Sequence, residues 1–137
     1  MFNEHVYLYV DDDPMSREAI KVILTRVMGI ERLWVFENSG DFMERIKALN
    51  APPDVILLDI HVAPHNGFEM LAMLRRDPAF TDARVIALTA SVMSDEVTLL
   101  QKSGFNGAIG KPINVTAFPD IVGRIIHGES VWYITGP

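Results

Sequence analysis

The apolar run at residues 55–58 ends on Asp59, and this placement constrains the fold more than any other feature of the sequence. An aliphatic run of this length is typical of a strand buried on both faces of a parallel sheet. Burying a carboxylate is costly, so such a strand should not end on one unless the acid has a chemical role. In open parallel sheets the carboxyl ends of the strands form the crevice where ligands bind. Asp59 is therefore expected in such a crevice.

Three other strand-like runs also end on polar side chains. Residues 6–10 lead into Asp11 and Asp12, residues 85–88 into Thr89, and residues 108–110 into Lys111. If these runs are parallel strands of one sheet, three acids, a hydroxyl and an amine meet at one edge. This combination predicts a site that accepts a phosphoryl group.

Strand-like and helix-like segments alternate along the 137 residues, without a low-complexity linker or an internal repeat. Five such βα units predict an α/β fold, with a parallel sheet covered by helices on both faces. In the first helix, apolar residues recur at helical spacing from Ala19 to Val27. Residues 1–128 are expected to form one domain, and residues 129–137 a short tail of open placement with no output domain.

Capping and breaking residues predict several helix ends. Asp13 should cap the first helix ahead of Pro14, and Gly29 should end it. Ser39 should cap the second helix. The last helix should begin near Thr116, which puts a proline in its first turn. Three large apolar residues are expected in the core: Met93, Phe105 and Phe118.

Composition excludes several classes of protein. The chain has no cysteine, so it has neither a disulfide framework nor a thiolate metal site. Its first residues lack the basic and apolar pattern of a signal peptide, so none is expected, and no apolar stretch approaches the roughly 20 residues that would span a membrane. A net charge of −6 argues against binding to nucleic acid or to an anionic membrane. We expect a cytoplasmic protein whose partners are other proteins.

The polar motifs occur in an order that is characteristic of one family. They are Asp11-Asp12, Asp59, Gly67 eight residues later, Thr89-Ala90 and Lys111-Pro112. This arrangement resembles the receiver domain of two-component response regulators, of the single-domain chemotaxis type. The resemblance covers roughly residues 6–127. It implies a flavodoxin-like, doubly wound, five-stranded parallel sheet of the (βα)5 type, with strand order 2-1-3-4-5.

The resemblance also implies a magnesium site. Three carboxylates within about 4 Å repel one another by roughly 4 kcal/mol per pair at an effective dielectric constant near 20. A hard divalent cation relieves this repulsion, and ligands that are all oxygen suit Mg²⁺. By resemblance, Asp12, Asp59 and the backbone carbonyl of His61 hold the ion, and Asp11 holds it through a water.

The same resemblance assigns the roles in phosphoryl transfer. Asp59 is the expected phosphoacceptor, and Lys111 is expected to pair first with it and then with a phosphate oxygen. Thr89 and the backbone N–H of Ala90 are expected to donate hydrogen bonds to the phosphoryl group. The bond between Lys111 and Pro112 is expected to be cis, as it is in the family.

Expected partners are a sensor histidine kinase or a histidine phosphotransfer protein, and a downstream target that binds the face formed by the fourth helix, fifth strand and fifth helix. Two positions depart from the family pattern. Pro64 lies five residues after the acceptor instead of four, because Ala63 occupies the usual place. Ala108 stands three residues before the lysine, where the family often has an aromatic ring.

Three other functions remain as alternatives. A receiver-like adaptor would keep the fold but signal without phosphorylation. A phosphatase of the haloacid dehalogenase type would need an acid at position 61, where His61 stands. A flavodoxin-like electron carrier would need a phosphate-binding loop after the first strand, where the acids would repel a flavin phosphate.

Overall fold

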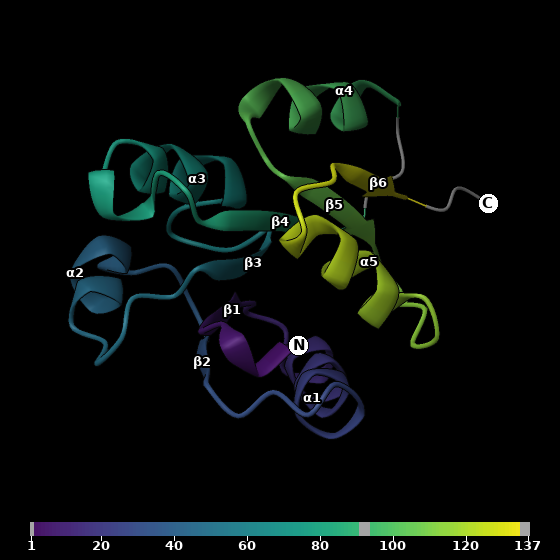
Figure 1. Cartoon of the computed structure of the whole chain (residues 1–137). Coiled ribbons are helices and arrows are strands. Elements are labelled where there is room, and N and C mark those ends of the chain that lie inside the picture. Colours follow the sequence, from purple (N-terminus) through teal and green to yellow (C-terminus); the bar gives the residue numbers. More distant parts are fainter. Residues whose placement is uncertain (1, 91–93, 135–137) are drawn as a thin grey trace.

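The computed structural model describes residues 2–90 and 94–134, and within them six strands form one parallel sheet. The strand order is β2-β1-β3-β4-β5-β6, so the expected order 2-1-3-4-5 is confirmed and a sixth strand lies beside β5 (Figure 1). The strands are β1 Tyr7–Val10, β2 Leu33–Phe36, β3 Val55–Asp59, β4 Arg84–Thr89, β5 Gly107–Gly110 and β6 Val131–Tyr133.

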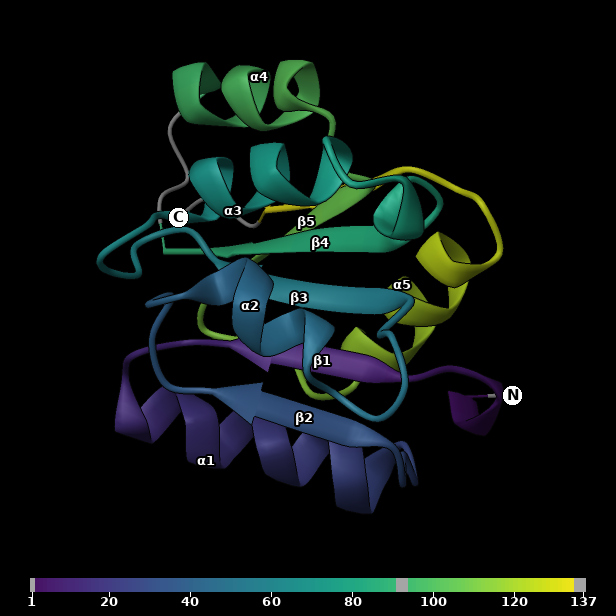
Figure 2. The ribbon, with the colours of Figure 1, turned by 90° about the vertical axis from the view of Figure 1, so that its left-hand side faces the viewer.

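Helices cover both faces of the sheet, as the alternating pattern predicts (Figure 2). Residues of α1 and α5 pack on one face, and residues of α2, α3 and α4 pack on the other. No helix in the described part of the chain is both long and apolar enough to cross a membrane. The helices are α1 Pro14–Val22, α2 Phe42–Lys47, α3 Gly67–Arg75, α4 Ser94–Ser103 and α5 Phe118–Ile126, with 3-10 turns at Phe2–Glu4 and Pro78–Phe80.

The first helix begins as expected but ends with a wider turn. Asp13 caps α1 by accepting a hydrogen bond from the backbone N–H of Met15. The segment Ile23–Val27 is a π-helical turn, in which the N–H of Met28 donates to the carbonyl of Ile23. This turn inserts one residue into the helical repeat, so Met28 is buried, whereas Val27, the last apolar residue of the predicted helical spacing, is 54% exposed.

One expected helix start is wrong. The N-cap of α2 is Asp41, not Ser39. The Ser39 hydroxyl instead bridges to the loop before α3, donating to the carbonyl of His65 and accepting from its N–H. The last helix begins at Phe118, two residues after Thr116, with Pro119 in its first turn as predicted. The side-chain oxygen of Asn114 accepts from the N–H of Thr116 and holds that residue in the turn before the helix.

The core largely follows the sequence pattern. Phe105 and Phe118 are buried as expected, whereas Met93 lies outside the described residues. The strands β1, β3 and β4 are buried on both faces apart from Arg84, which is half-buried at the start of β4. This burial explains why their sequences are almost continuously apolar until they reach the polar residues at their carboxyl ends.

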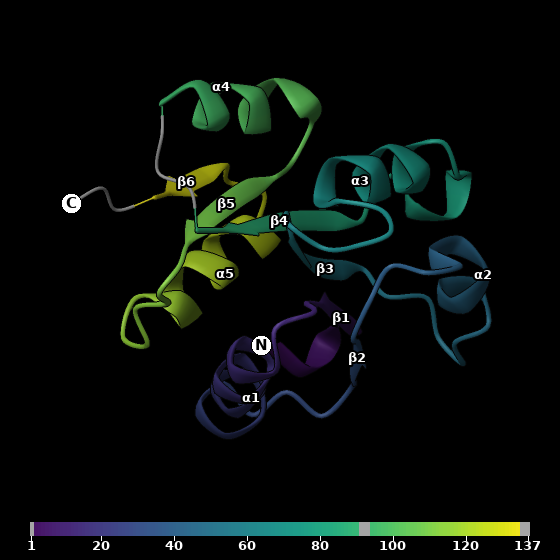
Figure 3. The same ribbon diagram turned by 180° about the vertical axis from the view of Figure 1, so that it is seen from behind.

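The segment after Gly128 extends the sheet. The sequence alone had left its placement open. In β6, Trp132 lies opposite Ala108 and Tyr133 opposite Ile109 of β5. Trp132 packs against the core layer under α4, and Tyr133 against the layer under α5. Figure 3 shows β6 between α4 and α5. The expected docking face of α4, β5 and α5 therefore carries β6 along the edge of β5.

Candidate functional site

Three carboxylates gather where β1 and β3 end. Asp11 follows β1 directly and is fully buried, Asp59 is the last residue of β3 and is 6% exposed, and Asp12 is exposed. One oxygen from each of the three lies within 4.8 Å of the others. We call these three residues the acid cluster. Parallel pairing of β1 with β3 brings the two chain segments to the same edge, as predicted.

Lys111 reaches the acid cluster from the end of β5. Its Nζ lies 2.9 Å from Oδ2 of Asp11 and 3.3 Å from Oδ2 of Asp59. Its third neighbour is the hydroxyl of Ser16 on α1, at 3.4 Å. Burial alone would lower the pKa of Lys111, but the hydrogen bond to Asp11 and the charge of Asp59 raise that pKa above its ordinary value. The lysine is therefore charged at neutral pH.

Asp11 accepts hydrogen bonds from two further groups. The Tyr9 hydroxyl donates to its Oδ2 over 2.5 Å, and the backbone N–H of Asp13 donates to its Oδ1 over 3.0 Å. Burial alone would raise the pKa of Asp11. The hydrogen bonds from Tyr9 and Lys111 outweigh burial, so the pKa lies below its ordinary value and the carboxylate stays ionised.

Asp59 is held less tightly than Asp11. Its Oδ1 accepts a hydrogen bond from the backbone N–H of His61 over 3.2 Å, and its Oδ2 faces Lys111. Burial and the neighbouring Asp11 raise the pKa of Asp59, although the charge of Lys111 and the bond from His61 oppose this. A carboxylate destabilised in this way is the member of the cluster that gains most from a cation or from losing its charge.

Thr89 and Ala90 lie at the end of β4, beside the end of β3. Thr89 is fully buried, and its hydroxyl donates to a carboxylate oxygen of Glu96 on α4 over 3.3 Å. Ala90 follows directly and is exposed. Thr89 thus lies at the expected edge of the sheet, and its hydroxyl contacts Glu96 of α4.

Asp12 and Asp13 are adjacent in sequence but differ in their surroundings. Asp12 belongs to the acid cluster, whereas Asp13 accepts hydrogen bonds from the Ser16 hydroxyl and from the N–H of Met15. These bonds, with that from Ser16 the larger effect, lower the pKa of Asp13. Asp13 therefore acts as a helix cap, in agreement with the sequence prediction.

The acid cluster fits a divalent cation. With three carboxylates ionised, Lys111 leaves two negative charges unbalanced, which is the charge of one Mg²⁺ ion. The donors are carboxylate oxygens, which magnesium prefers. The cluster is of the kind that receiver domains use to bind magnesium. The Lys111–Pro112 bond is cis as expected, and the bond between Ala63 and Pro64 is also cis.

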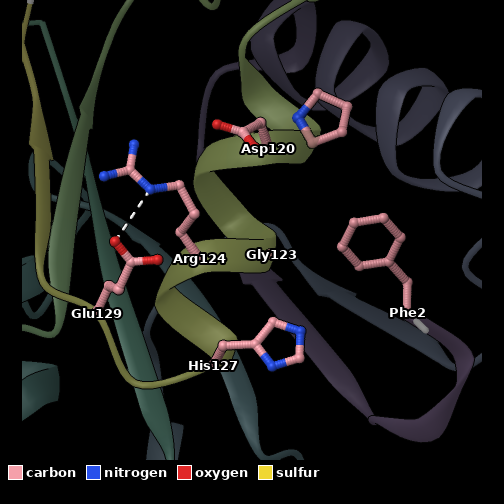
Figure 4. A pocket seen from close by; sticks show the side chains of 7 residues that line it. Phe2, Asp120, Gly123, Arg124, His127 and Glu129 are labelled. Carbon is pink, nitrogen blue, oxygen red and sulfur yellow. Dashed lines mark hydrogen bonds and ion pairs between the residues drawn. The ribbon is translucent and has the colours of Figure 1, made fainter.

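The position of this site does not follow from the volume of the surface hollows. A hollow of about 450 Å³ lies along α5, and none of the three acids of the cluster lines it (Figure 4). Phe2 faces α5 across this hollow, and Arg124 there makes an ion pair with Glu129 at 3.2 Å. A smaller hollow of about 290 Å³ adjoins the site and includes Lys111 and Met15 in its wall. The functional site is thus identified by converging charges, not by volume.

Three residues of the site were missed from the sequence. Tyr9 could have been found, because residues two apart in a strand share a face and Tyr9 precedes Asp11 by two. Ser16 and Glu96 could not, because each is a polar residue on a helix with no local signal that it reaches a strand end. Only the packing of α1 and α4 on the sheet brings them there.

Comparison with known proteins agrees with the geometry. The family described as response regulator receiver domain matches residues 7–122. Chemotaxis protein CheY1 of Helicobacter pylori is 31% identical over 105 residues, which cover 77% of this chain and 83% of that protein. A nitrate/nitrite response regulator protein homolog of Haemophilus influenzae is 30% identical over 90% of this chain. This chain spans 58% of that relative's length.

A solved structure supports the fold independently. The signal receiver domain of a signal transduction histidine kinase from Syntrophus aciditrophicus superposes with a TM-score of 0.77 at 23% identity, covering 90% of this chain and 91% of that one. At this identity the likeness concerns the fold alone. The family match spans most of the chain and includes every strand end that carries a site residue. The chain therefore belongs to the response regulator receiver domain family of two-component signal transduction.

Proposed function

We propose that this protein accepts a phosphoryl group on Asp59, in a magnesium-dependent reaction, from a phosphohistidine of a sensor histidine kinase or a histidine phosphotransfer protein. It then signals by contact with a downstream protein, so it is a signalling protein rather than a conventional enzyme. We expect it to work in the cytoplasm, as receiver domains typically do. Nucleic acid and membranes are not expected partners.

One observation carries this proposal. Asp59 is a nearly buried carboxylate at a strand end, with two further acids within 4.8 Å and the Lys111 ammonium 3.3 Å away. Its raised pKa shows that the ionised carboxylate is not fully compensated in the structure. A bound cation and an incoming phosphoryl group would complete the charge balance, and the acid would then serve as a nucleophile.

The chain's own residues would do the following work. An Asp59 oxygen forms a bond to phosphorus while the bond from phosphorus to the donor's imidazole nitrogen breaks. Asp12, Asp59 and the His61 carbonyl would hold Mg²⁺, with Asp11 acting through a water. When bound, the ion neutralises charge on the phosphoryl oxygens. Lys111 already lies between two acids and would contact a phosphate oxygen of the incoming group.

Thr89 would couple the site to α4. In this structure its hydroxyl donates to Glu96. Donating to a phosphate oxygen requires that it leave Glu96, and the change would reach the first turn of α4, where Glu96 lies. The N–H of Ala90 is the expected second donor. This coupling needs no aromatic ring at Ala108.

The surface beside the site suits a protein donor. Met15 is 82% exposed at the start of α1, and Val115 is 50% exposed in the loop after Lys111. These side chains flank the hollow of about 290 Å³ that adjoins Lys111. Exposed apolar side chains around a charged site are typical of a surface that a partner covers. We therefore place the phosphoryl donor against α1 and the loop after β5.

The downstream partner is expected on the face formed by α4, β5 and α5. Because β6 pairs with β5 at the edge of the sheet, this face also includes β6. Trp132 and Tyr133 are half-buried there and would contribute to any contact on that side. The downstream partner should therefore recognise residues of β6 in addition to the two helices.

The decisive experiment is incubation with acetyl phosphate and Mg²⁺, followed by intact mass measurement. We expect one added phosphoryl group in the parent and none in Asp59→Asn. Chelation of the metal should prevent the addition in the parent. Asp54→Asn is a matched control, because Asp54 is an acid immediately before β3, paired with His5 instead of Lys111, and should not affect phosphorylation. A parent that gains no phosphoryl group would favour the phosphorylation-independent adaptor.

A further inference from the structure

Tyr9 brings a phenol to the buried side of the acid cluster. Its side chain is fully buried, and its hydroxyl donates to Oδ2 of Asp11, which is also fully buried. Burial and the hydrogen bond to Asp11 raise the pKa of Tyr9, so the phenol keeps its proton at neutral pH. A neutral donor on a buried carboxylate stabilises the ionised form without adding a charge to the site.

The oxygen that Tyr9 contacts is the one that Lys111 also contacts, at 2.9 Å. The other oxygen of Asp11 accepts from the backbone N–H of Asp13. Lys111 is shared with Asp59, whereas the donors from Tyr9 and Asp13 are each fixed to Asp11 by the strand and by the turn that follows it. If Lys111 turns toward a phosphoryl group, Tyr9 is the donor that stays on Oδ2.

We propose that Tyr9 is a positioning residue, which holds the Asp11 carboxylate in the orientation that magnesium coordination requires, before and after Lys111 moves to the phosphoryl group. The inference rests on the proposed function, since it concerns the same metal site. Tyr9 contacts Asp11 and would touch neither the ion nor the phosphoryl group, so it acts through that acid.

Tyr7 offers a matched control on the same strand. It is also fully buried, lies on the same face of β1, and packs in the same core layer as Tyr9. Its hydroxyl donates to the backbone carbonyl of Phe2 over 2.9 Å, at the end of the strand remote from the acids. Replacing either tyrosine by phenylalanine therefore removes one buried hydroxyl from β1, and only one of the two changes touches the acid cluster.

Calorimetric titration with Mg²⁺ alone tests the inference without any phosphorylation. Tyr9→Phe should weaken magnesium binding about tenfold, the effect of losing one hydrogen bond to a charged group. Tyr7→Phe should leave it within about twofold, although both variants lose a buried hydrogen bond. Equal magnesium affinities in the two variants would overturn the positioning role.

The magnesium dependence of phosphorylation provides a second readout. With acetyl phosphate as donor, Tyr9→Phe should need more Mg²⁺ than the parent but should approach the parent rate at saturating Mg²⁺. A rate that stays low at saturation would overturn the inference, because it would place the role of Tyr9 outside metal binding. If the parent itself is not phosphorylated, the proposed function fails while the calorimetric comparison still decides the role of Tyr9.

A measurement on the unaltered chain covers the case in which Tyr9→Phe does not fold. Aromatic NMR spectra of the parent should show the ring resonances of Tyr9 shifting on addition of Mg²⁺, and those of Tyr7 staying in place. Assignment can use Tyr7→Phe and Tyr133→Phe, since the chain has three tyrosines. Unmoved Tyr9 resonances at saturating Mg²⁺ would contradict the proposal.

Discussion

Asp11 and Asp59 are held at the carboxyl ends of β1 and β3 by charged and hydrogen-bonding partners, whereas Trp132 and Tyr133 on β6 are held by apolar packing against the two core layers. Both regions join segments that are distant in sequence. In the acid cluster the like charges repel, so the arrangement lowers the stability of the fold. The same arrangement provides the proposed site for a cation and a phosphoryl group. At the β6 edge, meaning β6 with the facing residues of β5, strand pairing and burial supply stability.

This difference predicts that the two regions can be damaged separately. Substitutions in the acid cluster should abolish phosphorylation or metal binding and leave the fold intact. Substitutions at the β6 edge should lower the free energy of unfolding and leave phosphorylation by a small-molecule donor intact. A substitution that changed both properties would show that the regions are coupled.

The largest effect is expected from Asp59→Asn. Phosphorylation should be lost completely, while stability without Mg²⁺ should equal or exceed that of the parent. The pKa of Asp59 is raised in the folded state, so its ionisation lowers stability as the pH rises through that folded pKa. Asparagine does not ionise and escapes this cost. Chemical denaturation at several pH values checks the prediction, and a mutant clearly less stable than the parent at neutral pH would contradict it.

The next effect distinguishes two adjacent acids. Asp12→Ala should weaken magnesium binding by about tenfold or more, because it removes a ligand of the acid cluster. Asp13→Ala should hardly change magnesium binding but should cost about 1 kcal/mol of stability through the lost helix cap. Calorimetry and denaturation on both variants provide the test. Equal loss of magnesium affinity would show that the assignment of the two positions is wrong.

At the β6 edge, Gly107→Ala should destabilise the protein by about 1–3 kcal/mol, since the new methyl group overpacks a filled space. A Cβ at this position would lie 2.6 Å from the Val131 carbonyl oxygen and 2.5 Å from the Ile125 side chain. Gly40→Ala is the control, because its Cβ would approach one flexible side chain, that of Asn38. Similar unfolding free energies in the two variants would show that β6 can shift to accommodate the added methyl group at little cost in stability.

The smallest effect compares the two edges of the sheet. Trp132→Ala should cost about 1–2 kcal/mol, less than a fully buried tryptophan, because Trp132 is half-buried. Trp34→Ala on the opposite edge strand β2 should cost less, since Trp34 is 36% exposed. Both variants should accept phosphate from acetyl phosphate at close to the parent rate. A larger loss of stability in Trp34→Ala than in Trp132→Ala would contradict this prediction.

The fold could be predicted because its signals are local. The apolar strands, the glycine at position 29 and the cap at Asp13 each depend on nearby residues, and the structure places them as expected. Ser39 shows where this reasoning fails. Its sequence context suits a helix cap, but a loop 26 residues later offers its hydroxyl both a donor and an acceptor. Two hydrogen bonds to a distant segment outweigh one local cap.

The sequence by itself determined the strand ends that carry Asp11, Asp59, Thr89 and Lys111, because a buried run that stops on a polar group is a local pattern. The tertiary structure decided which groups surround them. It placed the Tyr9 hydroxyl where it donates a hydrogen bond to Asp11, and the Thr89 hydroxyl where it donates one to Glu96. It also added β6 to the edge of β5. These contacts depend on how helices and a short tail pack on the sheet, and packing depends on the shape of the whole core, which no local stretch of residues encodes.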